Sequence, residues 1–251
     1  MNRDELFRYL DSYLEIDAFS SFDYSLNGLV VGDPAGGDIE RISLAVDASL
    51  ATFQAAVAQK SDLLLVHHGL YWGSPIAVTG AHYRRIKTLL DAQVSLYAAH
   101  LPLDAHPEVG NNAQMAQILG LEEVEAFAPY RGVPIGFKGS FATPQSIQWV
   151  CERLGFSNPV VLEHGKKQIS SVGIVSGGAS DSLGSAIAED LDLFITGEIK
   201  HEAYHEALEH QVNLIGGGHY ETEVFGVKAL GAHLSERFGL VVSFIDKPTG
   251  L

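Results

Sequence analysis

The stretch DLLLVHHGLYW, residues 62–72, decides how the rest of this sequence is interpreted, because an apolar run leads directly into two adjacent histidines. A short apolar run followed by a glycine is typical of a buried strand in a parallel sheet. Successive side chains of a strand point to opposite faces, so His67 and His68 do not easily bind the same ion. Gly69 permits a turn directly after them. The pair therefore indicates two metal ions, one on either side of the chain.

Strand-like runs and helical patterns alternate along most of the chain. The runs RISLAV, DLLLV and VSLYAA in the first half, and SSVGIV, LDLFIT and VNLIG in the second, are separated by segments with helical periodicity. This alternation predicts an α/β fold in which helices pack on mostly parallel sheets.

Two portions of the sequence look like one unit used twice. Residues 42–69, from ISLAVD to VHHG, parallel residues 170–198, from SSVGIV to FITGE. The continuation of each portion sets His100 against His219 and Asp104 against Glu223, so the pattern His-x-x-x-acid occurs twice. Ligands of open α/β sheets bind just beyond strand ends, where these residues fall. We therefore expect two pseudo-symmetric lobes, residues 1–125 and 126–251, in a single compact structural unit with a metal site in the cleft between them.

The segments GGGHYETE (216–223) and AAHLPLDAH (98–106) supply further candidate ligands. If a helix begins near His219, then His219 and Glu223 share one face, and the long carboxylate can bridge two metals. Pro102 argues against a regular helix through the other segment, so Asp104 is expected on a loop as a terminal ligand.

The predicted metal ligands are therefore three histidines and two carboxylates: His67, His68, Asp104, His219 and Glu223. One ion would take His68 and Asp104 and the other His67 and His219, with Glu223 between them. Each ion then keeps open positions, as catalytic sites do. Nitrogen and oxygen ligands without cysteine suit two divalent ions of Zn, Fe, Mn or Ni. The alternative is that these histidines are hydrogen-bonded structural residues.

Two further residues are candidates for proton transfer. Glu198, in TGE, is the predicted general base, or else a carboxylate that orients a ligand imidazole. His100 is expected to support a ligand or to contact the substrate, and it shares the proton-shuttle role with Glu198. His201 and His205 lie on a helical segment and are either solvated or line the cleft.

Composition narrows the choice of partners. The 251 residues carry a net charge of −15, from 31 acids and 16 bases, which argues against binding nucleic acid or anionic membranes. No run approaches the length of a membrane span. The single cysteine, Cys151, excludes a disulfide within the chain and fits a cytoplasmic protein. Cys151 is expected to be a structural thiol on a helix capped by Thr143.

Together, the segments LLLVHHGLYW, YAAHLPLDAHPEVGNNAQMAQILG, FITGE and GGGHYETE resemble the dinuclear metal centre family, the NGG-interacting factor three-like proteins, in its short bacterial form. The resemblance covers nearly the whole chain, including SLNGLVVG near the amino terminus. It implies the same five metal ligands, with Glu223 as the bridge, and places His100 and Glu198 in the pocket. It also implies a homohexamer, a toroidal trimer of dimers. Tyr220 stands where some relatives have a second histidine.

Members of this family are often labelled GTP cyclohydrolase one type two homologues. The resemblance thus implies a dinuclear metal-dependent hydrolase, with GTP as one substrate, water attack on the guanine ring and release of formate. Hydrolysis of a phosphoester or a cyclic amide is equally natural for two metal ions. The alternative is a non-catalytic ring protein that stores or delivers metal or acts as a scaffold. A nucleic-acid role, suggested by the ring shape, is opposed by the net charge.

Overall fold

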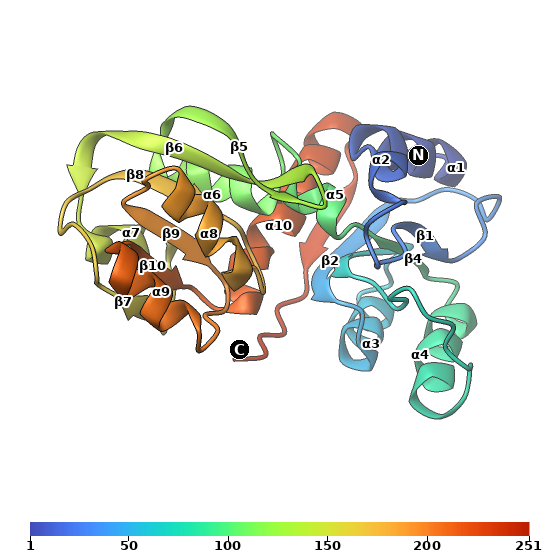
Figure 1. The fold of residues 1–251 in the computed structure, drawn as a ribbon. Coiled ribbons are helices and arrows are strands. Elements are labelled where there is room, and N and C mark those ends of the chain that lie inside the picture. Colours follow the sequence, from blue (N-terminus) through green and yellow to red (C-terminus); the bar gives the residue numbers. More distant parts are fainter. Residues whose placement is uncertain (251) are drawn as a thin grey trace. The chain divides into compact units, whose positions relative to one another are not determined.

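The computed structural model describes residues 1–250, and the chain divides into two compact units (Figure 1). Unit 1 comprises Met1–Leu103 and Val227–Lys247, and unit 2 comprises Asp104–Gly226 and the residues from Pro248. These boundaries differ from the predicted division at residue 125. There are two reasons: Met115, Ala116 and Leu119 pack in the core of unit 2, and the strand near the C-terminus pairs with a strand of unit 1, between residues 200 positions apart in the sequence.

Unit 1 is built on a five-stranded sheet with the order β1-β4-β3-β2-β11. Strands β2, β3, β4 and β11 run parallel, and β1 pairs antiparallel with β4. Its strands are β1 (Gly28–Val31), β2 (Arg41–Asp47), β3 (Leu63–His68), β4 (Ser95–Ala98) and β11 (Val241–Phe244), and its helices are α1 (Arg3–Tyr13), α2 (Ile16–Phe19), α3 (Leu50–Ala58) and α4 (Gly80–Asp91).

The run LLLV of β3 lies in the middle of this sheet, which explains its unbroken apolar character. Leu64 and Val66 pack on one face with Phe53 of α3 and Leu89 of α4, and all four side chains are fully buried. The helix α3 begins at a capping box formed by Ser49 and Thr52. Burial on both faces therefore fixes β3 and the two histidines at its end.

Tyr97 of β4 ties the sheet of unit 1 to its first helix. The ring is fully buried, and its hydroxyl donates a hydrogen bond to Asp11 Oδ1 on α1 at 2.7 Å. Burial first, and then the negative charge of Asp11, raise the pKa of the Tyr97 phenol well above its ordinary value of 10.0. The phenol therefore stays neutral in the folded protein under conditions in which it ionises in the unfolded chain.

This difference predicts a loss of stability at alkaline pH. Above the ordinary pKa the unfolded chain binds fewer protons than the folded one, so the free energy of unfolding falls by up to about 1.4 kcal/mol per pH unit. In Tyr97→Phe this contribution is absent, and we expect its stability to fall less between about pH 9 and about pH 11. Urea unfolding followed by circular dichroism measures both proteins. An equal fall in the two would contradict the assignment.

Unit 2 has a six-stranded sheet with the order β5-β6-β8-β9-β10-β7. Strands β8, β9 and β10 run parallel, whereas β5, β6 and β7 pair antiparallel with their neighbours, so parallel pairing is less extensive here than the sequence predicts. Its elements are α6 (Asn111–Leu119), β5 (Glu122–Tyr130), β6 (Val133–Gln145), α7 (Ile147–Leu154), β7 (Val160–Leu162), β8 (Ile169–Ile174), the 3-10 helix η1 (Ser180–Ser182), α8 (Leu183–Ala188), β9 (Leu193–Thr196), α9 (Ala203–His210) and β10 (Asn213–Gly216).

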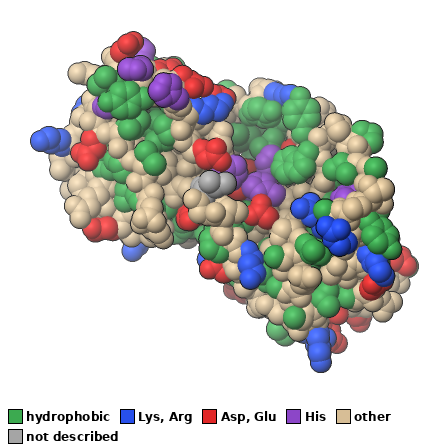
Figure 2. All heavy atoms as spheres, turned by 90° about the horizontal axis from the view of Figure 1, so that it is seen from below, with side chains coloured by type: hydrophobic (Ala, Val, Ile, Leu, Met, Phe, Trp, Pro, Cys, Tyr) green, Lys and Arg blue, Asp and Glu red, His purple; other side chains and the backbone are tan. Residues whose placement is uncertain are grey.

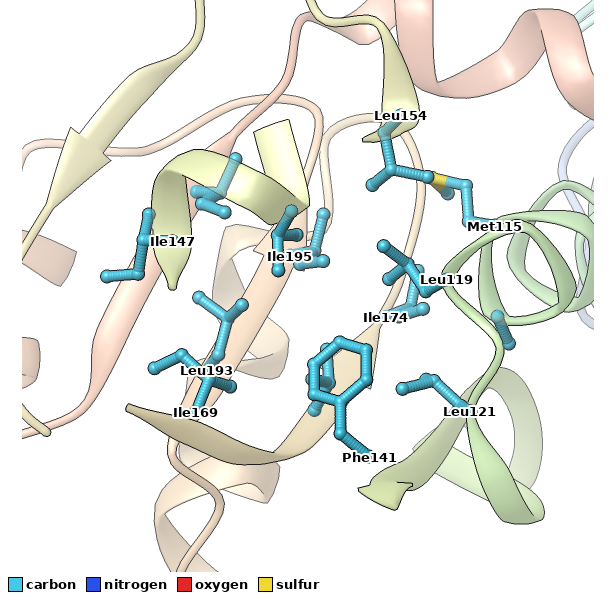
Figure 3. Packing of buried hydrophobic residues seen from close by; sticks show 14 of the residues in the cluster. Met115, Leu119, Leu121, Phe141, Ile147, Leu154, Ile169, Ile174, Leu193 and Ile195 are labelled. Atoms are coloured by element: carbon cyan, nitrogen blue, oxygen red, sulfur yellow. The ribbon is translucent and has the colours of Figure 1, made fainter. Parts of the chain in front are cut away.

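The core of unit 2 lies between its sheet and the helices α6 and α7. Figure 3 shows Leu119 of α6, Phe141 of β6 and Ile174 of β8 converging in this core, and all three are buried. Cys151 of α7 packs against the same cluster, and burial raises the pKa of its thiol. The thiol is thus less nucleophilic at neutral pH than an exposed one, consistent with a structural role.

Two local predictions are wrong in detail. The helix α7 is capped by Ser146, whose side chain accepts from the backbone of Trp149, and not by Thr143. Strand β6 continues as far as Gln145, which pairs with Ile169, and so delays the helix start. Asp104 ends a one-turn helix, α5 (Leu101–Asp104), and does not lie on a loop. A proline in the first turn of a helix costs no hydrogen bond, which is why Pro102 is tolerated there.

The helix α10 (His219–Phe238) starts in unit 2 and ends in unit 1, and its first residue is the one predicted from the sequence. The strands β2-β3-β4 and β8-β9-β10 follow the same order and direction within their own sheets. Each series is followed at the end of its third strand by a histidine, His100 or His219. Among residues 1–250, no helix is both long and apolar enough to cross a membrane.

Candidate metal centre

Three imidazoles of unit 1 gather where β3 and β4 end. His67 and His68 are the last two residues of β3, and His100 follows the neighbouring strand β4. Each of the three offers a ring nitrogen, and these nitrogens lie within 4.8 Å of one another. The rings of His67 and His68 are 4.7 Å apart and inclined at 46°. This group is therefore close enough to place its nitrogens around metal ions.

The neighbours of His67 and His68 orient both rings. His67 is completely buried, and its Nδ1–H donates to the carbonyl oxygen of Ala99 at 3.0 Å. His68 Nδ1–H donates to Asp47 Oδ1 at 2.8 Å. A proton on Nδ1 puts the lone pair of each ring on Nε2, which is the usual arrangement for a metal-ligating histidine.

His100 is oriented in the same way by Asp23. Its Nδ1 lies 2.9 Å from Asp23 Oδ1, and the carboxylate side chain is only 1% exposed. Burial alone would raise the pKa of Asp23, but hydrogen bonding and charge attraction from His100, with further hydrogen bonds from Asn27 and Ser25, bring that pKa below its ordinary value. Asp23 is therefore an ionised, buried acceptor that holds the His100 ring in place.

Trp72 forms an apolar wall beside this group. Its indole ring centre lies 5.0 Å from that of His100 and 5.8 Å from that of His68. The indole N–H donates to the carbonyl oxygen of Gly69 at 3.1 Å, which fixes the ring although 42% of the residue is exposed. A half-exposed indole beside imidazoles limits the access of water and offers a surface to a planar ligand.

Unit 2 carries its own candidate ligands at the start of α10. His219 Nε2 lies 3.2 Å from Glu223 Oε1, one helical turn further along, as the spacing predicts. His219 Nδ1 lies 2.5 Å from Glu198 Oε1. Glu223 is buried, whereas the side chain of Glu198 is 52% exposed. Glu198 thus does for His219 what Asp47 does for His68, which agrees with one of its two predicted roles.

Asp104 is buried in unit 2 within a polar network. Its Oδ1 accepts hydrogen bonds from Asn111 Nδ2 at 2.9 Å and from Ser176 Oγ at 2.8 Å. Asn112 donates to the Asp104 carbonyl oxygen and accepts from the backbone N–H of Ser176. The carboxylate is thus held in one orientation, which a terminal metal ligand requires.

The structure brings the predicted site residues together in two sets, one in each unit. His67, His68 and His100 belong to one group in unit 1, and His219, Glu223 and Glu198 form a hydrogen-bonded series in unit 2. His100 thus joins the candidate ligands directly, beyond the supporting role that the sequence suggested.

Two functional residues escaped the sequence analysis. Asp47 ends the apolar strand β2 and stands in register with His68 on β3, so the motif ISLAVD carried a usable signal. Asp23 lies 77 residues before its partner His100, in a segment without any recognisable pattern. Neither could be found from metal-ligand spacing, because both act through an imidazole.

The remaining histidines of α9 and its approach do not belong to these groups. His201, His205 and His210 are exposed, and neither candidate metal group among residues 1–250 includes them. On the face drawn in Figure 2, histidine side chains are visible beside hydrophobic and acidic ones. Because His201, His205 and His210 are exposed and belong to neither group, solvation is the better interpretation of these three histidines.

Comparisons with known proteins identify the family of this chain. The profile of the family Duf34/NIF3 (NGG1p interacting factor 3) matches residues 1–249. A Deinococcus radiodurans protein called "GTP cyclohydrolase 1 type 2 homolog" is 46% identical over 255 residues, covering 100% of this chain and 95% of its own. A Pyrococcus abyssi protein of the same name is 43% identical over 255 residues, with 100% of each chain covered. The crystal structure of TTHA1606 from Thermus thermophilus superposes with a TM-score of 0.90 at 45% identity, covering 100% of both chains. The resemblance inferred from the motifs is confirmed, and the chain belongs to the Duf34/NIF3 family.

Proposed function

We propose that this protein is a metal-dependent hydrolase that binds two divalent ions through His67, His68, Asp104, His219 and Glu223, with His100 as a further candidate ligand. One observation carries the proposal: every candidate histidine has Nδ1 bonded to a carbonyl or carboxylate oxygen, so that Nε2 carries the lone pair. This arrangement is characteristic of metal-ligating histidines and is not required of structural ones. The names of the relatives support the choice of a hydrolase.

The nitrogen and oxygen donors fit two divalent ions of intermediate softness. Imidazole nitrogens and carboxylate oxygens suit Zn, Fe, Mn or Ni, and the nearby residues include no cysteine. When bound, such ions acidify a water molecule and polarise the bond that it attacks. The buried carboxylates of Asp104 and Glu223 balance the charge of cations in this environment.

Glu198 is the residue proposed to move a proton. Its Oε1 holds His219 Nδ1, and its half-exposed side chain leaves Oε2 as the atom that takes a proton from the attacking water. Trp72 limits water access beside His68 and His100 and provides a surface for a planar group. GTP, with attack on the guanine ring and release of formate, is one proposed substrate, and phosphoesters and cyclic amides are the others.

The proposal is tested by metal content and by Glu198→Gln. Elemental analysis of the untagged protein should give about two ions per chain, as in two-metal hydrolases. The amide introduced in Glu198→Gln still accepts a hydrogen bond from His219 but takes no proton, so we expect normal metal content and a kcat reduced at least about 100-fold. A variant with unchanged kcat would leave Glu198 with only the orienting role.

The second candidate function is non-catalytic metal storage or delivery, or a scaffold role. The partly exposed imidazoles of His68 and His219 favour it, because an ion held there remains within reach of solvent. Fully metallated protein that turns over neither GTP nor any phosphoester or cyclic amide, yet transfers its ions to a chelator, would support this function over hydrolysis. Assembly into a homohexamer stays a prediction.

A further inference from the structure

A second site of unit 1 lies at the opposite ends of the strands from the imidazoles. A cavity of about 710 Å³ is lined by residues that precede β3 and β4, among them Ser61, Asp62 and Ser95. His67, His68 and His100 lie at the other ends of these strands. The six residues of β3 separate the two ends of this strand by about 20 Å. The cavity is therefore distinct from the candidate metal centre.

The guanidinium of Arg3 is the feature that marks this cavity. Arg3 lines it and is only 7% exposed. Of its five N–H donors, only one on Nη1 has an acceptor among residues 1–250, Ser95 Oγ at 3.2 Å. Nε is buried and has no hydrogen-bond partner among residues 1–250, and no carboxylate there forms an ion pair with Arg3. A buried cation left in this state costs free energy unless a ligand or water satisfies it.

The loop before β2 closes over the guanidinium. An added Cβ at Gly36 would lie 2.8 Å from Arg3 Nη1, so only glycine allows this approach without displacing the arginine. The backbone N–H of Arg3 donates to the carbonyl oxygen of Gly37, which holds the loop against the start of α1. The guanidinium is thus fixed in position before any ligand arrives.

The other charged residues of the lining make the net charge of the cavity negative, although Arg3 itself is a cation. Asp33, Asp38 and Asp62 line the cavity together with one further cation, Lys60, so the formal charge of the lining is −1 when Arg3 is included. Asp33 and Asp38 are exposed at the rim, in contrast to the buried Arg3. A simple anion would be attracted by Arg3 and repelled by the rim. A molecule with a carboxylate at one end and an ammonium group at the other is complementary to both.

We propose that this cavity binds a small zwitterion of the α-amino-acid type. Its carboxylate pairs with the terminal N–H groups of the Arg3 guanidinium that have no acceptor among residues 1–250. Its ammonium group faces the rim carboxylates, and Val57, Leu89 and Val94 in the lining receive an aliphatic side chain. The volume lies within the usual range of about 300–1,000 Å³ for small-molecule sites.

The side-chain Nε–H signal of Arg3 in a ¹H–¹⁵N spectrum of the full chain tests the proposal. The probes are L-leucine, 4-methylpentanoate, which lacks the ammonium group, and 3-methylbutylamine, which lacks the carboxylate, each to about 10 mM. We expect L-leucine to shift the signal at the lowest concentration, the carboxylate to act more weakly and the amine to have no effect. Leucine chelated by metal ions about 20 Å away would not shift this signal.

Two variants test the recognition of the ligand's carboxylate and of its ammonium group separately. Arg3→Gln removes the Nε–H signal, so leucine binding is followed there by the backbone N–H signal of Gly36 in the lining, and we expect it to weaken at least about tenfold. Asp38→Asn keeps Arg3 and its loop, so it serves where the first variant fails to fold. It should weaken leucine binding about two- to fivefold and strengthen binding of 4-methylpentanoate. An Arg3 signal that no probe moves would mean that water alone satisfies the guanidinium and would overturn the site. Equal responses to leucine and 4-methylpentanoate, unchanged in Asp38→Asn, would overturn the zwitterion.

Discussion

Replacing Gly197 by alanine is expected to destabilise the protein by about 1–3 kcal/mol and to weaken metal binding at the same time. A Cβ at this position would lie 2.7 Å from the Gly177 carbonyl oxygen, 2.8 Å from His219 Cα and 2.8 Å from Thr222 Oγ1. Two of these atoms belong to the backbone and cannot rotate away. The start of α10 must therefore shift, and His219 moves with it.

The backbone hydrogen bonds around Gly197 make the shift costly. Its N–H donates to the Gly177 carbonyl oxygen at 2.9 Å, and its own carbonyl oxygen accepts from Gly218 at 3.0 Å. Gly184→Ala is the matched control, because Gly184 is in the helix α8 and an added Cβ meets no atom within 4 Å. We expect that variant to be up to about 1 kcal/mol more stable. Urea unfolding and metal titration of both variants measure these effects, and a Gly197→Ala protein as stable as Gly184→Ala would disprove the steric argument.

Replacing His68 by alanine is expected to reduce the affinity for at least one metal ion by about 100-fold or more. Loss of a residue that only orients a ligand typically costs about 10–100-fold, and loss of the ligand itself should exceed that. Fold stability should change less, because the His68 side chain is partly exposed and its main partner, Asp47, is 36% exposed. Elemental analysis after dialysis should thus find about two ions per chain in the native protein and one or none in the variant.

The control for this experiment is His210→Ala, which removes an exposed imidazole at the end of α9. Its metal content should equal that of the native protein. If His68→Ala and native protein retained equal metal, or if neither took up any on titration, His67 and His68 would be structural residues, and the hydrolase proposal would fail with them.

The sequence predicts the strands and the one-turn spacing of His219 and Glu223 well, because both depend on residues close together in the chain. The run LLLV before His67 reports burial on both faces of β3, and the four-residue spacing of His219 and Glu223 is the geometry of one helical turn. Asp23 could not be predicted, since its link to His100 depends on how the chain folds back over 77 residues. The unit boundaries could not be predicted either, because they depend on where β11 pairs. The shortage of hydrogen-bond acceptors around Arg3 is likewise a property of the folded chain and not of the local sequence.

The pairing of β11 with β2 has a consequence for how the protein is made. Residues 41–47 leave the ribosome about 200 residues before their partners, residues 241–244. Domains usually fold as they emerge, amino-terminal parts first, but here the sheet of unit 1 keeps an open strand edge until β11 has been synthesised. An exposed edge of apolar strand is a template for pairing with other chains. The nascent polypeptide therefore depends, until β11 has been made, on protection of β2 from association with neighbouring molecules.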